Sequence, residues 1–145
     1  MENMKDILKK GGYKKIKFKI SKTNHLFIKA KINGILGDFI LDTGASNSCI
    51  DFSHIDHFNI FPENSSTKAS GAGANGMHTQ VAYHNHLQMS RWHNKSFNLV
   101  IIDLTHVNVA LIEYKVKTVH GIIGSDVLLQ GNAIIDYKEQ VLYIQ

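Results

Sequence analysis

The chain has 145 residues, 43% of them hydrophobic. This length suits one domain with a substantial core and is too short for two domains of ordinary size. The formal charge of +4 and the pI near 9.1 are typical of proteins with a polyanionic partner. The lysines, however, crowd the first third of the chain without an aromatic or glycine-rich surface beside them, so we expect no nucleic-acid partner.

Cysteine usage and hydropathy bear on the cellular compartment. Cys49 is the single cysteine, so no internal disulfide can form and packing must hold the fold together. No apolar run approaches the ~20 residues needed to span a bilayer, and residues 1–10 lack the apolar middle of a signal peptide. We therefore expect a cytoplasmic protein with no membrane partner.

The beginning of the chain is predicted to lie outside the main domain. Residues 1–14 have helical spacing of apolar side chains up to Gly11-Gly12, where the pattern ends, and are expected to form an amino-terminal arm or short helix. Residues 15–145 are expected to form the domain.

Residues 15–41 are predicted to be half-buried strands. Apolar side chains alternate there with lysines at period two. Asn33-Gly34 predicts a tight hairpin, because both residues tolerate positive φ. The second strand of that hairpin, residues 37–41, ends at Asp42.

The rest of the chain is predicted to be mostly strand with one clear helix. In chain order we expect a strand at 48–52, a polar loop at 62–67, a long hairpin with a glycine-rich tip at 70–76, a strand at 97–102, a helix capped by Thr105 and running to Tyr114, a buried strand at 119–124, a short helical turn capped by Ser125, and a closing hairpin of 133–136 with 141–144.

The segment around Asp42 carries the first chemical motif. The apolar run from Phe39 to Leu41 leads directly into Asp42, Thr43 and Gly44. A carboxylate at the end of a buried strand is costly unless it is hydrogen-bonded or partnered. Asp-Thr-Gly is also common turn chemistry, so on its own the motif leaves an ordinary turn as the alternative.

A second motif lies far downstream, where His120-Gly121-Ile122-Ile123-Gly124 runs into a short helix with Asp126 near its start. Together with Asp42-Thr43-Gly44-Ala45 and the glycine-tipped hairpin between them, it resembles the retropepsin-like (retroviral-type) aspartic peptidase family, single-domain homodimeric type. The resemblance covers about residues 15–145. It implies a mostly β fold, a compact closed β barrel with one or two short helices.

The resemblance implies a role for each matching residue. Asp42 would be catalytic, the Thr43 hydroxyl would brace the two active-site loops, and Gly44 would allow their close approach. Structural support would come from Ala45, Ile123, Gly124 and Asp126. Asp126 has an equally plain alternative as a first-turn acid favoured by the helix dipole. The flap over bound peptide would consist of Gly71, Ala72, Gly73 and Gly76.

The chemistry of this family predicts a homodimer. One carboxylate takes a proton from the attacking water while a second, protonated one polarises the scissile carbonyl. Among the acidic residues only Asp42 is followed by Thr-Gly, so the second carboxylate must come from another copy across a twofold axis. We therefore expect an aspartic endopeptidase acting on peptide or protein substrates without a cofactor. Residues 141–144 could interleave between subunits or finish their own subunit's sheet.

Two alternatives remain beside this interpretation. The fold could persist as a non-proteolytic dimerisation or peptide-binding module, although the intact Asp42 motif favours an enzyme. The nine histidines invite a metal site, but structural zinc usually takes four ligands, often thiolates, and we expect no metal here. The side chains that could line a substrate pocket, or equally form plain core, are Ile40, Val100, Ile101 and Ile122.

Overall fold

Strands are the main secondary structure of the computed structural model, which describes residues 3–69 and 77–145. In chain order the elements are α1 (Met4–Lys10), β1 (Lys14–Ile20), β2 (Leu26–Ile32), β3 (Ile35–Leu41), β4 (Cys49–Asp51), the 3-10 turn η1 (Phe52–His54), β5 (Glu63–Ala69), β6 (Met77–Met89), β7 (Trp92–Ile102), α2 (Thr105–Glu113), β8 (Gly121–Ile123), α3 (Ser125–Gln130), β9 (Ile134–Asp136) and β10 (Val141–Ile144).

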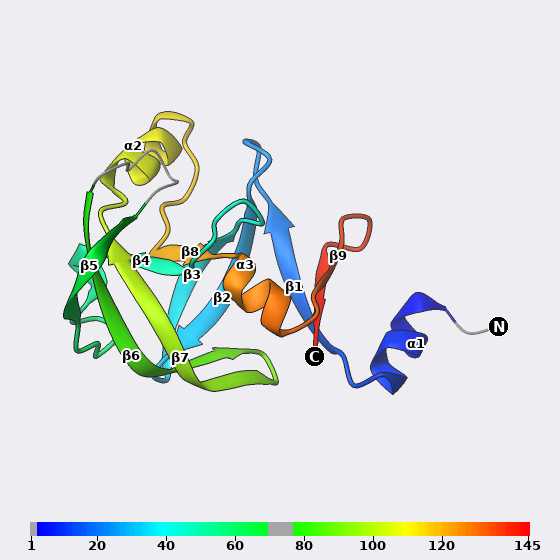
Figure 1. Cartoon of the computed structure of the whole chain (residues 1–145). Coiled ribbons are helices and arrows are strands. Elements are labelled where there is room, and N and C mark those ends of the chain that lie inside the picture. Colours follow the sequence, from blue (N-terminus) through cyan, green and yellow to red (C-terminus); the bar gives the residue numbers. More distant parts are fainter. Residues whose placement is uncertain (1–2, 70–76) are drawn as a thin grey trace.

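The strands form one sheet that closes on itself. Their order is β5-β6-β7-β4-β8-β3-β2-β1-β10-β9, and an additional pairing of β6 with β2 joins six of them into a barrel (Figure 1). Alternating apolar side chains fill the interior, as the burial of Leu26, Ile28, Ala30 and Ile32 along β2 illustrates. The predicted mostly β, closed-barrel fold is confirmed.

The hairpin that delivers Asp42 forms as predicted. Asn33 and Gly34 have φ values of 53° and 83°, the positive values that a two-residue turn of this kind requires. The register pairs Ile32 with Ile35 and continues to Leu26 opposite Leu41. Asp42 therefore emerges directly after the end of a well-paired strand.

Three local predictions were wrong. Residues 63–67 were expected in a loop but belong to β5, because antiparallel pairing with β6 overrides their polar composition. Thr105 does not cap α2: its N–H and hydroxyl both donate to Asp103, and Leu104 takes the cap position. Ser125 does not cap α3 either, since Gly124 precedes the helix and no side chain caps it.

Two apolar clusters divide the interior. The larger fills the barrel and includes Ile101, which is fully buried and so cannot line a pocket. The smaller lies where α2 packs over β3, β4 and β8; Figure 1 shows α2 above β4 and β8. Its buried members are Ile40, Cys49, Ile102, Leu104, Leu111, Val119 and Ile122.

The two ends of the domain meet in a sheet of three strands. β10 pairs with β1 on one side and with β9 on the other, so the alternative in which 141–144 finish their own subunit's sheet is the observed one. The helix α1 has no buried residue and stands beside this sheet (Figure 1). No helix among the described residues is long and apolar enough to cross a membrane.

Candidate active site

The loop that begins at Asp42 is anchored at both its backbone and its carboxylate. The Asp42 N–H donates to the carbonyl of Ile123 on β8 at 2.9 Å, and the Ala45 N–H donates back to the Asp42 carbonyl at 3.2 Å. The Gly44 N–H donates to Asp42 Oδ1 at 2.8 Å. Asp42 is half-buried, and its other carboxylate oxygen accepts no hydrogen bond from the residues described. One oxygen is thus held while the other is available.

Gly124 lies so close to this loop that only glycine fits. A Cβ built on Gly124 would stand 2.5 Å from the carbonyl oxygen of Ala45, a backbone atom that cannot swing aside. The Ser125 N–H donates to that same Ala45 oxygen at 2.7 Å. The two sequence motifs therefore meet in space, the second packing directly behind the first.

A buried hydroxyl that the sequence did not single out links the same two segments. Ser48 is fully buried, and its hydroxyl donates to Asp126 Oδ1 at 2.7 Å while accepting the Gly124 N–H at 2.8 Å. The Ser48 N–H donates to Asp126 Oδ2 at 3.0 Å. Asp126 is therefore bonded to the active-site loop, in addition to lying in the first turn of α3. In the sequence, Ser48 is marked only as a hydroxyl residue directly before the apolar strand β4.

The remaining predicted site residues fall into two groups. Thr43 and Gly44 are exposed, and the Thr43 hydroxyl makes no hydrogen bond with any described residue. The predicted flap residues Gly71, Ala72, Gly73 and Gly76 lie outside the described residues.

Two other candidate groups near the loop are chemically occupied or inert. Burial raises the pKa of the Cys49 thiol to about 12, so it stays protonated and is no nucleophile. Asp51 accepts hydrogen bonds from Ser53 and, at 2.6 Å, from the Leu104 N–H. Burial alone would raise the pKa of Asp51, but these hydrogen bonds lower it overall. Asp51 is thus a structural carboxylate joining β4 to the start of α2.

The described part of the chain contains no group of three or more histidine, cysteine or acidic side chains that could hold a metal ion. Of the two carboxylates described at this loop, Asp42 is the one with an uncommitted oxygen, since both oxygens of Asp126 are bonded to Ser48.

Solved structures with a similar fold include retropepsin-like proteases. The chain superposes on a retropepsin-like aspartic protease from Rickettsia conorii with a TM-score of 0.62 and 16% identity, over 91% of this chain and 89% of that one. The EIAV protease in complex with the inhibitor HBY-793 gives a TM-score of 0.55 at 18% identity, over 77% and 92% of the two chains. The retroviral protease-like domain of Ddi1 from Leishmania major gives 0.56 at 18%, over 83% and 87%.

Sequence comparison supports the same assignment. No curated protein sequence matches the chain. Residues 28–127, however, match the family model described as aspartyl protease, a span that includes Asp42 to Ala45 and Gly121 to Asp126. With this match over more than half its length and the fold of its structural neighbours, the chain belongs to the aspartyl protease family and has a retropepsin-like fold.

Proposed function

We propose that the protein is an aspartic endopeptidase whose active site forms when two copies bring their Asp42 side chains together. The observation that carries this proposal is the state of Asp42: one oxygen is held by the Gly44 N–H, and the other is available on an exposed loop. A rigidly placed carboxylate with a free oxygen can hold and activate a water molecule.

The reaction needs two carboxylates in different protonation states. The ionised one takes a proton from the water as the water oxygen attacks the scissile carbonyl carbon. The protonated one donates a hydrogen bond to the carbonyl oxygen, which takes up the negative charge, and a proton then passes to the leaving nitrogen as the C–N bond breaks. Because two carboxylates so close cannot both ionise, the pair would share one proton and give a bell-shaped dependence of rate on pH.

Three other acidic side chains are already bonded to other groups, which supports a partner copy as the source of the second carboxylate. Asp38 forms ion pairs with Lys29 and Lys117, and Asp51 and Asp126 are committed to the hydrogen bonds described above. A twofold axis beside residues 42–46 would place an identical loop opposite the first. The exposed Thr43 hydroxyl would then be free to donate across that axis.

The test compares the purified chain with an Asp42→Asn variant, which keeps the shape of the side chain but cannot serve as the base. Both are incubated with a diverse peptide library over about pH 4 to 7, and their masses are measured by sedimentation. Cleavage by the wild type alone, from a dimeric species, is the expected result. A folded, dimeric wild type that cuts nothing would favour the non-proteolytic binding module, and cleavage by a strictly monomeric protein would exclude the shared dyad.

A further inference from the structure

A groove rich in lysine runs between the barrel and the segment that follows α2. It has a volume of about 740 Å³ and lies against β1, β2 and residues 115–117. Its walls between the charges are apolar, with Ile20, Phe27 and Val116 among them. We call it the lysine groove after the side chains that line it, Lys17, Lys19, Lys22, Lys29, Lys115 and Lys117.

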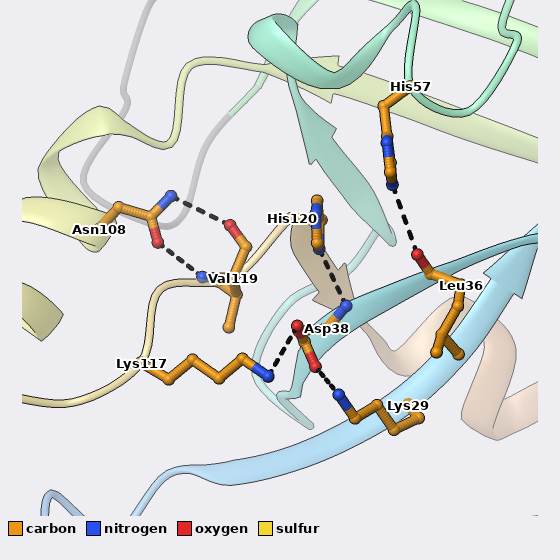
Figure 2. Close-up of polar contacts among 8 residues, drawn as sticks. All are labelled: Lys29, Leu36, Asp38, His57, Asn108, Lys117, Val119 and His120. Carbon is orange, nitrogen blue, oxygen red and sulfur yellow. Dashed lines mark hydrogen bonds and ion pairs between the residues drawn. The ribbon is translucent and has the colours of Figure 1, made fainter.

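Residues 115–117 line the groove, and the segment 115–119 is fixed to β3 and to α2 by polar contacts, which Figure 2 shows. Lys117 Nζ lies 3.0 Å from Asp38 Oδ2, and Lys29 pairs with the other oxygen of the same carboxylate. The side chain of Asn108 on α2 donates to the Val119 carbonyl at 3.1 Å and accepts the Val119 N–H at 2.9 Å. The groove is therefore held in shape before any ligand binds, which lowers the entropy cost of binding.

The charge of the lysine groove is strongly unbalanced. Among the described residues that line it, Asp38 is the single acidic one, and it is already paired with two lysines. Within the described ranges, none of the four other lysines lies within ion-pair distance of an acidic group: Lys17, Lys19, Lys22 and Lys115. Clustered like charges at a cleft with apolar walls concentrate the field and attract a ligand of opposite sign.

A second hollow adjoins the lysine groove. This hollow of about 670 Å³ lies between the turn after β1 and α2, and Lys22 lines both. Val107 and Leu111 of α2 line it, and they also pack in the apolar cluster that contains Ile40 and touches Ala45. Ile40 and Ala45 flank Asp42 in the sequence. The second hollow and the Asp42 loop thus contact the same apolar cluster.

We propose that the lysine groove binds an acidic stretch of the peptide substrate. This stretch carries glutamate or aspartate next to apolar residues and lies outside the segment cleaved at Asp42. This inference rests on the proposed function and names its substrate class. The charged rim selects the acids, and the apolar walls select the side chains between them. A peptide fits better than a nucleic acid because both rings that line the lysine groove, Phe18 and Phe27, are at least half-buried and leave little open face on which bases could stack.

The binding test uses the Asp42→Asn protein, so that cleavage does not interfere. A fluorescent peptide of alternating glutamate and leucine is titrated by anisotropy beside a matched peptide with glutamine in place of glutamate. In this background, the triple variant Lys19→Gln, Lys22→Gln, Lys115→Gln is compared with a control that loses the same charge at exposed lysines outside the groove. The control substitutions are Lys9→Gln, Lys95→Gln and Lys138→Gln.

The expected result is that the groove triple variant binds the acidic peptide roughly tenfold more weakly, from three exposed charge contacts of modest strength each. The control triple should bind normally, and added salt should weaken binding. Equal losses in the two triples, or equal binding of the glutamine peptide, would overturn the proposal. So would an oligonucleotide that displaces the peptide at equal charge concentration, because the groove would then be a general polyanion surface.

A parallel assay with the Asp42-intact protein separates this inference from the proposed function. If the chain cuts peptides, the groove triple should raise KM for acidic substrates and leave kcat unchanged, as expected for loss of uniform binding. Binding of the acidic peptide without any cleavage would sink the peptidase proposal and leave the groove intact. Cleavage of acidic and neutral peptides with equal kcat/KM would support the peptidase proposal and overturn the lysine-groove proposal.

Discussion

Replacing Ser48 with alanine should destabilise the protein by about 2.5–4 kcal/mol. The fully buried Ser48 hydroxyl donates to the Asp126 carboxylate at 2.7 Å and accepts the Gly124 N–H at 2.8 Å. The first bond, to an ionised acceptor, is worth about 1.5–3 kcal/mol, and leaving the Gly124 donor unpaired in the interior costs about 1–3 kcal/mol. The lower half of the summed range is expected, because Asp126 keeps its bond from the Ser48 N–H at 3.0 Å.

Urea unfolding at one fixed protein concentration measures this loss, the fixed concentration being needed because dimerisation adds to stability. Ser46→Ala is the matched control: Ser46 is exposed in the same loop, and its loss should cost under about 0.5 kcal/mol. In an Asp126→Ala background the Ser48 substitution should cost less than in the wild type, since the shared bond is already gone. A cost below about 0.5 kcal/mol for Ser48→Ala would refute the stabilising role of the Ser48 hydroxyl between Gly124 and Asp126.

Two further predictions concern contacts that hold the Asp42 loop and the strand that leads into it. Gly124→Ala forces a Cβ to within 2.5 Å of the Ala45 carbonyl oxygen. The free energy of unfolding should therefore fall by about 1–3 kcal/mol or more, and the melting temperature should drop. An unchanged melting temperature would show that the loop can move aside. His120 Nδ1 accepts the Asp38 N–H at 3.0 Å, and burial, then the neighbouring His54 and His57, lower the pKa of His120. The unfolded chain then takes up more protons as the pH falls through about 6.5, so stability should decline from about pH 7.5 to 5.5. His120→Asn keeps an acceptor and removes the titration; its stability should decline less over that range in thermal melts, and an equal decline would contradict the reasoning.

Local sequence patterns predicted the part of the fold that carries Asp42. The alternation of apolar and polar residues predicted the strands up to Leu41, and Asn33-Gly34 predicted the hairpin. Both features could be predicted because they depend on neighbours in the sequence. The meeting of the Asp42 loop with Gly124 followed from resemblance, not from any local pattern, since it is a contact between distant segments.

Features made by distant partners could not be predicted in the same way. The polar segment β5 becomes a strand because β6 pairs with it, and a hydroxyl such as that of Ser48 shows its role only once Asp126 lies beside it. The lysine groove joins Lys17 and Lys19 of β1 to Lys117, which the sequence separates widely. The alternation of lysines with apolar side chains on β1 had predicted only a half-buried strand.

Subunit mixing tests the central claim, a dyad built from two Asp42 residues, most directly. Active wild-type protein is equilibrated with an equal amount of Asp42→Asn protein, at a concentration where sedimentation shows dimers. With random exchange only about a quarter of the dimers carry both carboxylates, so total activity should fall to roughly half that of the wild type alone. Activity that stays unchanged while mass analysis shows mixed dimers would mean that one Asp42 suffices, and would contradict the account.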